Sequence, residues 1–216
     1  MRLIRASPIF HKKGMPARDR RKEFNRLYRS SEDTVDVVEV PSMNFLMIDG
    51  GGGGDPYKDF RDSIEAIYTV TYALKIVIGK SVIGFEYAVM PLESLRWTDT
   101  SGSPGEGSGR PRWRLMIVQP EYVGPDLYTE VLKKVEMKIS PRKLHEIRFE
   151  QFAEGLSAQT MHVGPYSEET ESMSRLHRAI QEKGYRMRGK HHEIYLSDPG
   201  KVLPSQLRTI LRQPVE

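Results

Sequence analysis

The chain has 216 residues and a mass of 24.8 kDa, enough for one large or two small modules with a hydrophobic core. Its net charge of +4 and calculated isoelectric point of about 9.2 make nucleic acid a partner to consider. The absence of cysteine excludes disulfides, a thiol nucleophile and a cysteine-bound metal.

Residues 1–34 form a basic extension. The segment from Arg20 to Arg29 interleaves basic residues with Phe24, Leu27 and Tyr28, which predicts an amphipathic helix laid against the body with its charges in solvent. Such a helix lacks the further helices of a DNA-reading module, so we expect no specific nucleic-acid binding. The opening segment has too short an apolar run for a signal peptide, and the later runs are interrupted by charge, so a soluble cytoplasmic protein without membrane contact is expected.

A first module is predicted over about residues 35–120. The β-branched run 35–40 ends at Pro41 and is expected to form a hairpin with a strand at 43–49, which the glycines 50–54 then break. A helix over 55–79 follows, with Asp55 as its N-cap. Its apolar face is expected to comprise Phe60, Ile64, Ile67, Thr71, Leu74 and Ile78. The next strand is predicted at 85–90.

The five-glycine run between strand and helix is a candidate phosphate-binding loop. A P-loop would supply Lys and Ser or Thr at the start of the helix, whereas here Asp55 would place a negative charge where the phosphate binds. The run is therefore interpreted as a connection beside a cleft.

The middle of the chain is predicted to contain a flexible loop at 101–112, a strand at 113–118 and a helix at 121–134. The second module, over about 145–216, should have strands at 147–152 and 156–163. Its helix is expected to run over 167–184, with Ser167 as N-cap and Gly184 as the stop. A strand at 191–196 follows, and Pro214 limits a closing strand.

These modules repeat one pattern of strand, glycine turn, capped helix and strand. When Gly54 is aligned with Gly164, the second copy is offset from the first by 164 − 54 = 110 positions. The predicted fold is α+β: duplicated strand-helix-strand-strand modules form a curved antiparallel sheet, with helices 55–79 and 167–184 on the opposite face. A pseudo-twofold cleft between the modules is the expected ligand site.

Glu193 is the candidate functional carboxylate. Alternation along its strand places His191, Glu193 and Tyr195 on one face and His192 with Ile194 on the other. The first face would present an acid beside an aromatic ring if that side is concave, and a solvated Glu193 remains the alternative. Because His191 and His192 point to opposite faces, we expect no metal site, and no G-x-S-x-G elbow supports serine hydrolysis.

Several segments resemble the GyrI-like small-molecule-binding family, in particular its stand-alone two-module members. They are VEVPSMNFLMIDG, GDPY, YAVMPLE followed by Trp97, MIVQPE, GLSAQTMHVGPYSEE, RLH, RGKHHEIYLSDP and the terminal RQPV. The resemblance covers most of the chain from Glu39 onward. Relatives often have two adjacent tryptophans after the PLE segment, where this chain has Arg96-Trp97.

The resemblance implies a ligand cleft lined by aromatics around Glu193, and a hydrolase that opens the cyclopropane ring of DNA-alkylating natural products. Glu193 would act as the base, and the hydroxyl of Tyr72 or Tyr195 would donate to the developing phenolate oxygen. The residues expected to line the ligand are Tyr195, Trp97, Trp113, Tyr166, His162, Met116 and Tyr68. No cofactor is expected, and the protein would be a monomer or small homo-oligomer. Alternatives are a non-catalytic binder that holds lipophilic cations by cation–π contacts, and a gyrase-inhibitor-like interaction protein.

Overall fold

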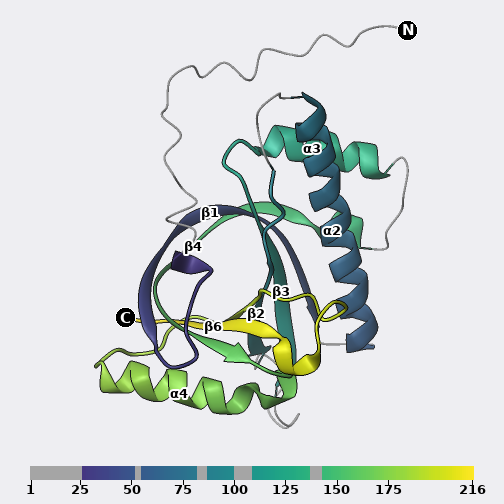
Figure 1. Ribbon diagram of the computed structural model, residues 1–216. Helices are drawn as coiled ribbons and strands as arrows, with labels where there is room; N and C mark the ends of the chain where they lie inside the picture. The colour runs from purple at the N-terminus through teal and green to yellow at the C-terminus, as the bar shows by residue number, and fades with distance from the viewer. Residues whose placement is uncertain (1–25, 52–54, 82–86, 100–108, 137–142) are drawn as a thin grey trace, which may run out of the picture.

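The computed structural model describes residues 26–51, 55–81, 87–99, 109–136 and 143–216, and the statements below concern these residues (Figure 1). The protein is α+β, as predicted. Six antiparallel strands close into a barrel in the order β1-β3-β2-β5-β6-β4, and three described α-helices lie outside it. The strands are β1 (Asp36–Gly51), β2 (Leu92–Asp99), β3 (Arg110–Gln119), β4 (Arg148–Val163), β5 (His191–Tyr195) and β6 (Arg208–Pro214). The helices are α2 (Pro56–Ser81), α3 (Pro125–Glu136) and α4 (Glu169–Glu182), with 3₁₀ turns η1 (Leu144–Glu146), η2 (Tyr166–Glu168) and η3 (Pro204–Gln206).

Two long strands replace the shorter ones that the sequence suggested. The predicted hairpin at Pro41 is wrong, because residues 36–51 form the single strand β1, which includes Gly50 and Gly51. Pro41 is tolerated because β3 pairs with β1 only from Asn44 onward, so Pro41 lies where β1 has β4 as its sole neighbour. The segments 147–152 and 156–163 likewise merge into β4, with Gly155 at a φ of +74° between them.

Helix α2 begins as predicted. Asp55 Oδ1 accepts hydrogen bonds from the backbone N–H groups of Tyr57 and Lys58, which confirms the N-cap. The predicted apolar face packs against the barrel, and Ile67 and Leu74 are fully buried. Helix α3 starts at Pro125, four residues later than expected.

Helix α4 starts differently from the prediction. Ser167 is not its N-cap, because η2 contains Ser167 and α4 begins at Glu169. Its predicted end is correct: Gly184 has a φ of +78°, and the N–H of Tyr185 donates to the carbonyl of Ile180.

Other predictions need correction around β2 and β3. Residues 87–90 belong to no strand, and β2 begins at Leu92, where it pairs with β3 on one side and β5 on the other. Residues 85–86, and residues 101–108 of the predicted loop, lie outside the described residues. The last part of that loop, 110–112, is strand, because it pairs with Asp99 to Trp97 of β2.

The barrel wall separates two environments. Inside lie an apolar cluster and a buried polar network, closed at one end by the described residues of the N-terminal segment, where Leu27 is 5% exposed. Outside, α2 and α3 cover one large apolar cluster and α4 covers another. None of the helices described is both long and apolar enough to span a membrane.

Candidate functional site

Glu193 lies on the outer face of the barrel, between the regions that α2 and α4 cover. β5 sits between β2 and β6, and Glu193 pairs with Ser94 on one side and with Leu211 on the other. Leu211 packs beneath α4, whereas Tyr195, on the same face as Glu193, packs against the α2 cluster. The predicted alternation is confirmed, since His192 instead joins the network inside the barrel.

Both oxygens of the Glu193 carboxylate have partners. Arg96 Nε lies 2.7 Å from Oε1, and the Tyr195 hydroxyl donates to Oε2 at 2.5 Å. Arg96 Nη2 in turn donates to the Tyr195 hydroxyl oxygen at 3.1 Å, which closes a ring of three side chains. Glu193 is only 4% exposed, and the Arg96 side chain is 46% exposed above it. The side chains of Arg96 and Tyr195 therefore cover the Glu193 carboxylate.

This ring is surrounded by aromatic side chains. Tyr166 of η2 meets Tyr195 edge to face, with 5.7 Å between ring centroids. On α2, Tyr68 stacks with Tyr72 at 6.1 Å and packs against the same apolar cluster as Tyr195, while Tyr72 is 50% exposed. Burial, followed by the negative charge of Glu193, raises the pKa of Tyr195 well above its usual value.

The other predicted lining residues lie elsewhere. Trp97 packs against the cluster inside the barrel, where Lys190 Nζ lies 3.6 Å from its ring centroid, and Met116 is buried in the same cluster. Trp113 shares the face of Glu193 but is covered by α2 and packs on Phe60.

His162 is held by structural contacts. Its ring nitrogens lie 3.1 Å from Ser172 Oγ of α4 and 3.1 Å from the carbonyl oxygen of Pro165. The structure therefore gathers Glu193, Tyr195 and Tyr166, places Tyr68 of α2 in the same apolar cluster as Tyr195, and separates them from Trp97 and Met116.

Sequence reasoning missed a set of polar side chains beside Glu193. Each has at least one buried atom without a hydrogen-bond partner: Ser94 Oγ, Thr209 Oγ1, Glu169 Oε1, His177 Nε2 and both ring nitrogens of His191. Ser94 pairs with Glu193 in register, and Thr209 pairs with Tyr195. Buried polar atoms normally have partners, so their concentration here is typical of a place that receives water or a polar ligand group. Strand pairing brings Ser94, His191 and Thr209 to this place, and the packing of α4 brings Glu169 and His177.

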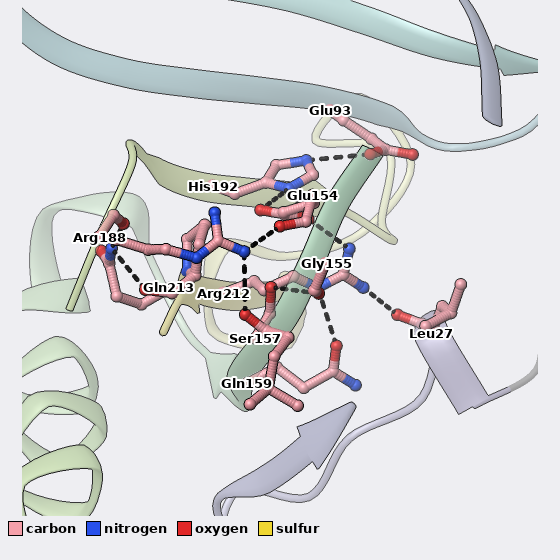
Figure 2. A network of polar contacts seen from close by, with 12 residues as sticks. Leu27, Glu93, Glu154, Gly155, Ser157, Gln159, Arg188, His192, Arg212 and Gln213 are labelled. Carbon is pink, nitrogen blue, oxygen red and sulfur yellow. Dashed lines mark hydrogen bonds and ion pairs between the residues drawn. The ribbon is translucent and has the colours of Figure 1, made fainter. Parts of the chain in front are cut away.

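A second charged cluster lies inside the barrel (Figure 2). His192 stands between two carboxylates, with Nε2 2.9 Å from Glu93 and Nδ1 3.0 Å from Glu154. Arg212, 1% exposed, bonds Glu154 at 3.2 Å and donates to the carbonyl of Leu27 at 2.6 Å. The network therefore ties four strands to the N-terminal segment.

The charges of this network support one another. Burial alone would lower the pKa of His192, but Glu154 and Glu93 raise it to about 9. Burial alone would raise the pKa of Glu154, but His192 and Arg212 lower it to about 2. Among the residues that the structure describes, no three His, Asp or Glu side chains are placed to hold a metal ion.

Comparison with known proteins gives the family. The model of the GyrI-like small molecule binding domain matches residues 120–216. An uncharacterized conserved protein from Listeria innocua is 30% identical, with a TM-score of 0.79, over 91% of this chain and 98% of its own. A hydrolase from Listeria innocua is 29% identical, with a TM-score of 0.77 over the same shares.

A more distant structure, the C-terminal domain of EcmrR, shares the fold at 14% identity and a TM-score of 0.51, over 85% of this chain and 97% of its own. No curated protein matches the chain in sequence. The resemblance found in the sequence motifs is thereby confirmed, and the chain belongs to the GyrI-like family.

Proposed function

We propose that this protein binds lipophilic aromatic small molecules at Glu193, between α2 and α4, and hydrolyses the cyclopropane ring of DNA-alkylating xenobiotics, which would protect the cell. The observation that carries the proposal is a buried carboxylate bonded to the phenol of Tyr195, with Tyr166 packed edge to face on that ring and Tyr68 of α2 in the same apolar cluster. A relative described as a hydrolase, 29% identical over most of both chains, supports the choice of a hydrolytic reaction.

Ligand entry would require Arg96 to move. Its side chain is half exposed, so it can turn outward and release Oε1 of Glu193 at modest cost. The freed carboxylate, in a site with little water, would then accept a proton from a water molecule attacking the cyclopropane carbon. The scheme also needs a proton donor near the developing phenolate oxygen, and the candidates expected from the sequence are the hydroxyls of Tyr72 and Tyr195.

The proposal includes the finer features expected from the sequence. The two strand-helix-strand-strand modules would be related by a pseudo-twofold axis through the region between α2 and α4. The protein would act in the cytoplasm as a monomer or small homo-oligomer, without cofactor, specific nucleic acid or membrane partner. Tyr68, Tyr166 and Tyr195 would contact the ligand, and Trp97, Trp113, Met116 and His162 would contact it only after rearrangement.

A second candidate is a binder of lipophilic cations without turnover. The contact that favours it is the 2.7 Å pair between Arg96 and Glu193, since it demonstrates that the carboxylate accepts a cationic partner at this position. The same contact disfavours external cations, because each would have to displace Arg96. We therefore expect the site to prefer neutral substrates over cationic ligands.

The test is turnover of a spirocyclopropane cyclohexadienone, in excess over protein, followed by chromatography of the ring-opened phenol. Glu193→Gln keeps the shape but removes the base, so turnover should fall by a factor on the order of 10² to 10⁴ while affinity is largely retained. Glu65→Gln, at an exposed position of α2, should behave as wild type. Binding without release of opened product over several turnovers would leave the non-catalytic binder as the function.

A further inference from the structure

Glu169 is a second buried carboxyl group beside Glu193. It is 9% exposed, and its Oε1 atom has no hydrogen-bond partner. It is the first residue of α4 and follows η2, whose Tyr166 contacts the ring of Tyr195. Two independent features thus meet at one place: an unsatisfied buried carboxyl oxygen and the ring of side chains that holds Glu193.

The groups around Glu169 set its protonation. Titratable or charged side chains on the elements packed nearby include Glu193, Tyr195 and His191 of β5, Arg96 of β2, Tyr166 and Glu168 of η2, His162 of β4, and Glu171, Arg175 and His177 of α4. Burial raises the pKa of Glu169 to about 7, and the negative charge of Glu193 acts in the same direction against the opposing charge of Arg96. A substantial fraction of Glu169 is therefore a neutral acid at neutral pH, while Glu193 is paired with a cation.

Tyr195 is badly placed to be the proton donor. A phenol has one proton, and Tyr195 already gives its own to Glu193 Oε2 at 2.5 Å. Its raised pKa makes transfer to a substrate oxygen harder still. Two carboxyl groups in different protonation states are the usual arrangement when one site needs both an acid and a base.

We propose that Glu169 is the proton donor of this site and that Glu193 is the base, an assignment that rests on the proposed function. The water oxygen bonds to the cyclopropane methylene while Glu193 takes the water proton. The carbon–carbon bond breaks, its electron pair enters the conjugated ring, and the carbonyl oxygen takes the proton of Glu169 to become a phenol. One proton has moved from Glu169 to the product and one from water to Glu193, and exchange with solvent restores both groups.

The assignment defines a substrate class. The substrate must be a neutral molecule whose ring becomes aromatic when the cyclopropane opens. It must have a hydrogen-bond-accepting carbonyl at one end, near Glu169, and an electrophilic carbon at the other, near Glu193. The unsatisfied hydroxyls of Ser94 and Thr209 lie in the same region and can hold the attacking water.

The experiment is the pH dependence of kcat for wild type, Glu169→Gln and Glu182→Gln. Wild type should lose activity as the pH rises through about 7, because the acid form of Glu169 is depleted. Glu169→Gln should lose this limb and reduce kcat by a factor on the order of 10². Glu182→Gln changes an exposed carboxylate of the same helix and should match wild type.

The outcomes separate the two proposals. If wild type turns over, Glu193→Gln does not, and Glu169→Gln retains wild-type kcat and its pH profile, Glu169 is not the donor and the hydrolase stands. If wild type has no turnover, both proposals fail. If Glu169→Gln does not fold, the pH dependence of kcat for the wild-type protein tests the assignment by itself. A kcat that stays constant between pH 6 and 8.5 would show that Glu169 is not the proton donor.

Discussion

Arg96 covers the Glu193 carboxylate, with its Nε atom 2.7 Å from Oε1. The structure places Arg96 on the carboxylate and Trp97 on the opposite side of β2. A tryptophan at position 96, which the family resemblance leads one to expect, would present an aromatic surface beside Glu193, where this chain has an internal cation. This difference bears on which ligands the site accepts.

Replacing Arg96 with Met removes the cation and keeps an apolar side chain of similar length. We expect affinity for an aromatic quaternary ammonium dye to rise by about tenfold, because the dye no longer competes with a guanidinium. Stability should fall by roughly 1 kcal/mol, since the pair is partly solvent-screened. Dye titration and urea unfolding measure the two effects, with Arg186→Met, at an 83% exposed side chain, as the control. Unchanged dye affinity would mean that Arg96 does not limit access.

At the scale of elements, the packing of α2 on β1 and β3 depends on the absence of a side chain at Gly50. A Cβ atom there would lie 2.0 Å from Cζ2 of Trp113 and 2.6 Å from Oδ2 of Asp59. Trp113 is fixed in turn by Phe60 of α2, with 5.2 Å between ring centroids. A methyl group at Gly50 would therefore force α2 away from the barrel.

Gly50→Ala should destabilise the protein by roughly 1–3 kcal/mol, the range for overpacking a dense core. Gly79→Ala is the matched control, because Gly79 lies within α2 and an added Cβ meets nothing within 4 Å. That control should instead stabilise by about 0.5–1 kcal/mol through helix propensity. Urea unfolding of both variants tests the contrast, and equal effects would argue against the tight contact at Trp113.

At the scale of the whole molecule, the network inside the barrel makes stability depend on pH. The pKa of His192 is raised from 6.5 to about 9, so its contribution is complete below about pH 6.5 and is lost as the pH rises to about 9. The pKa of Glu154 is lowered from 4.5 to about 2, so its contribution is complete above about pH 4.5 and is lost toward pH 2. The pKa of Glu169 is raised from 4.5 to about 7, so its effect on stability occurs between these pH values. The loss of stability between pH 7 and pH 9 is therefore assigned to His192.

We therefore expect the urea midpoint to fall between pH 7 and pH 9. In His192→Asn this fall should disappear, and the variant should be less stable by roughly 3–5 kcal/mol at pH 7, because two buried carboxylates lose their shared partner. His145→Asn, at a side chain that is 78% exposed, should retain the wild-type dependence. A wild-type midpoint that stays constant over this range would show that His192 is neutral in the barrel.

Local patterns determined much of this protein. Asp55 and Pro56 specify where α2 begins, the spacing from Phe60 to Ile78 specifies its buried face, and Gly184 ends the last helix turn. Alternation with a period of two correctly placed Glu193 and Tyr195 together, away from His192. These features depend on backbone geometry within one element, so the sequence alone contains them.

The tertiary structure decided whatever depends on which strands are neighbours. The sequence predicted a strand end at Pro41 and a break between two strands at 153–155, but pairing between β1 and β4 carries both strands through these positions. The contact of Arg96 with Glu193, and the burial of Glu169 beside them, bring together three elements that are far apart in the chain. Closure of the barrel sets those neighbours, and because it is a non-local event, no pattern along the sequence could reveal the partners of Glu193.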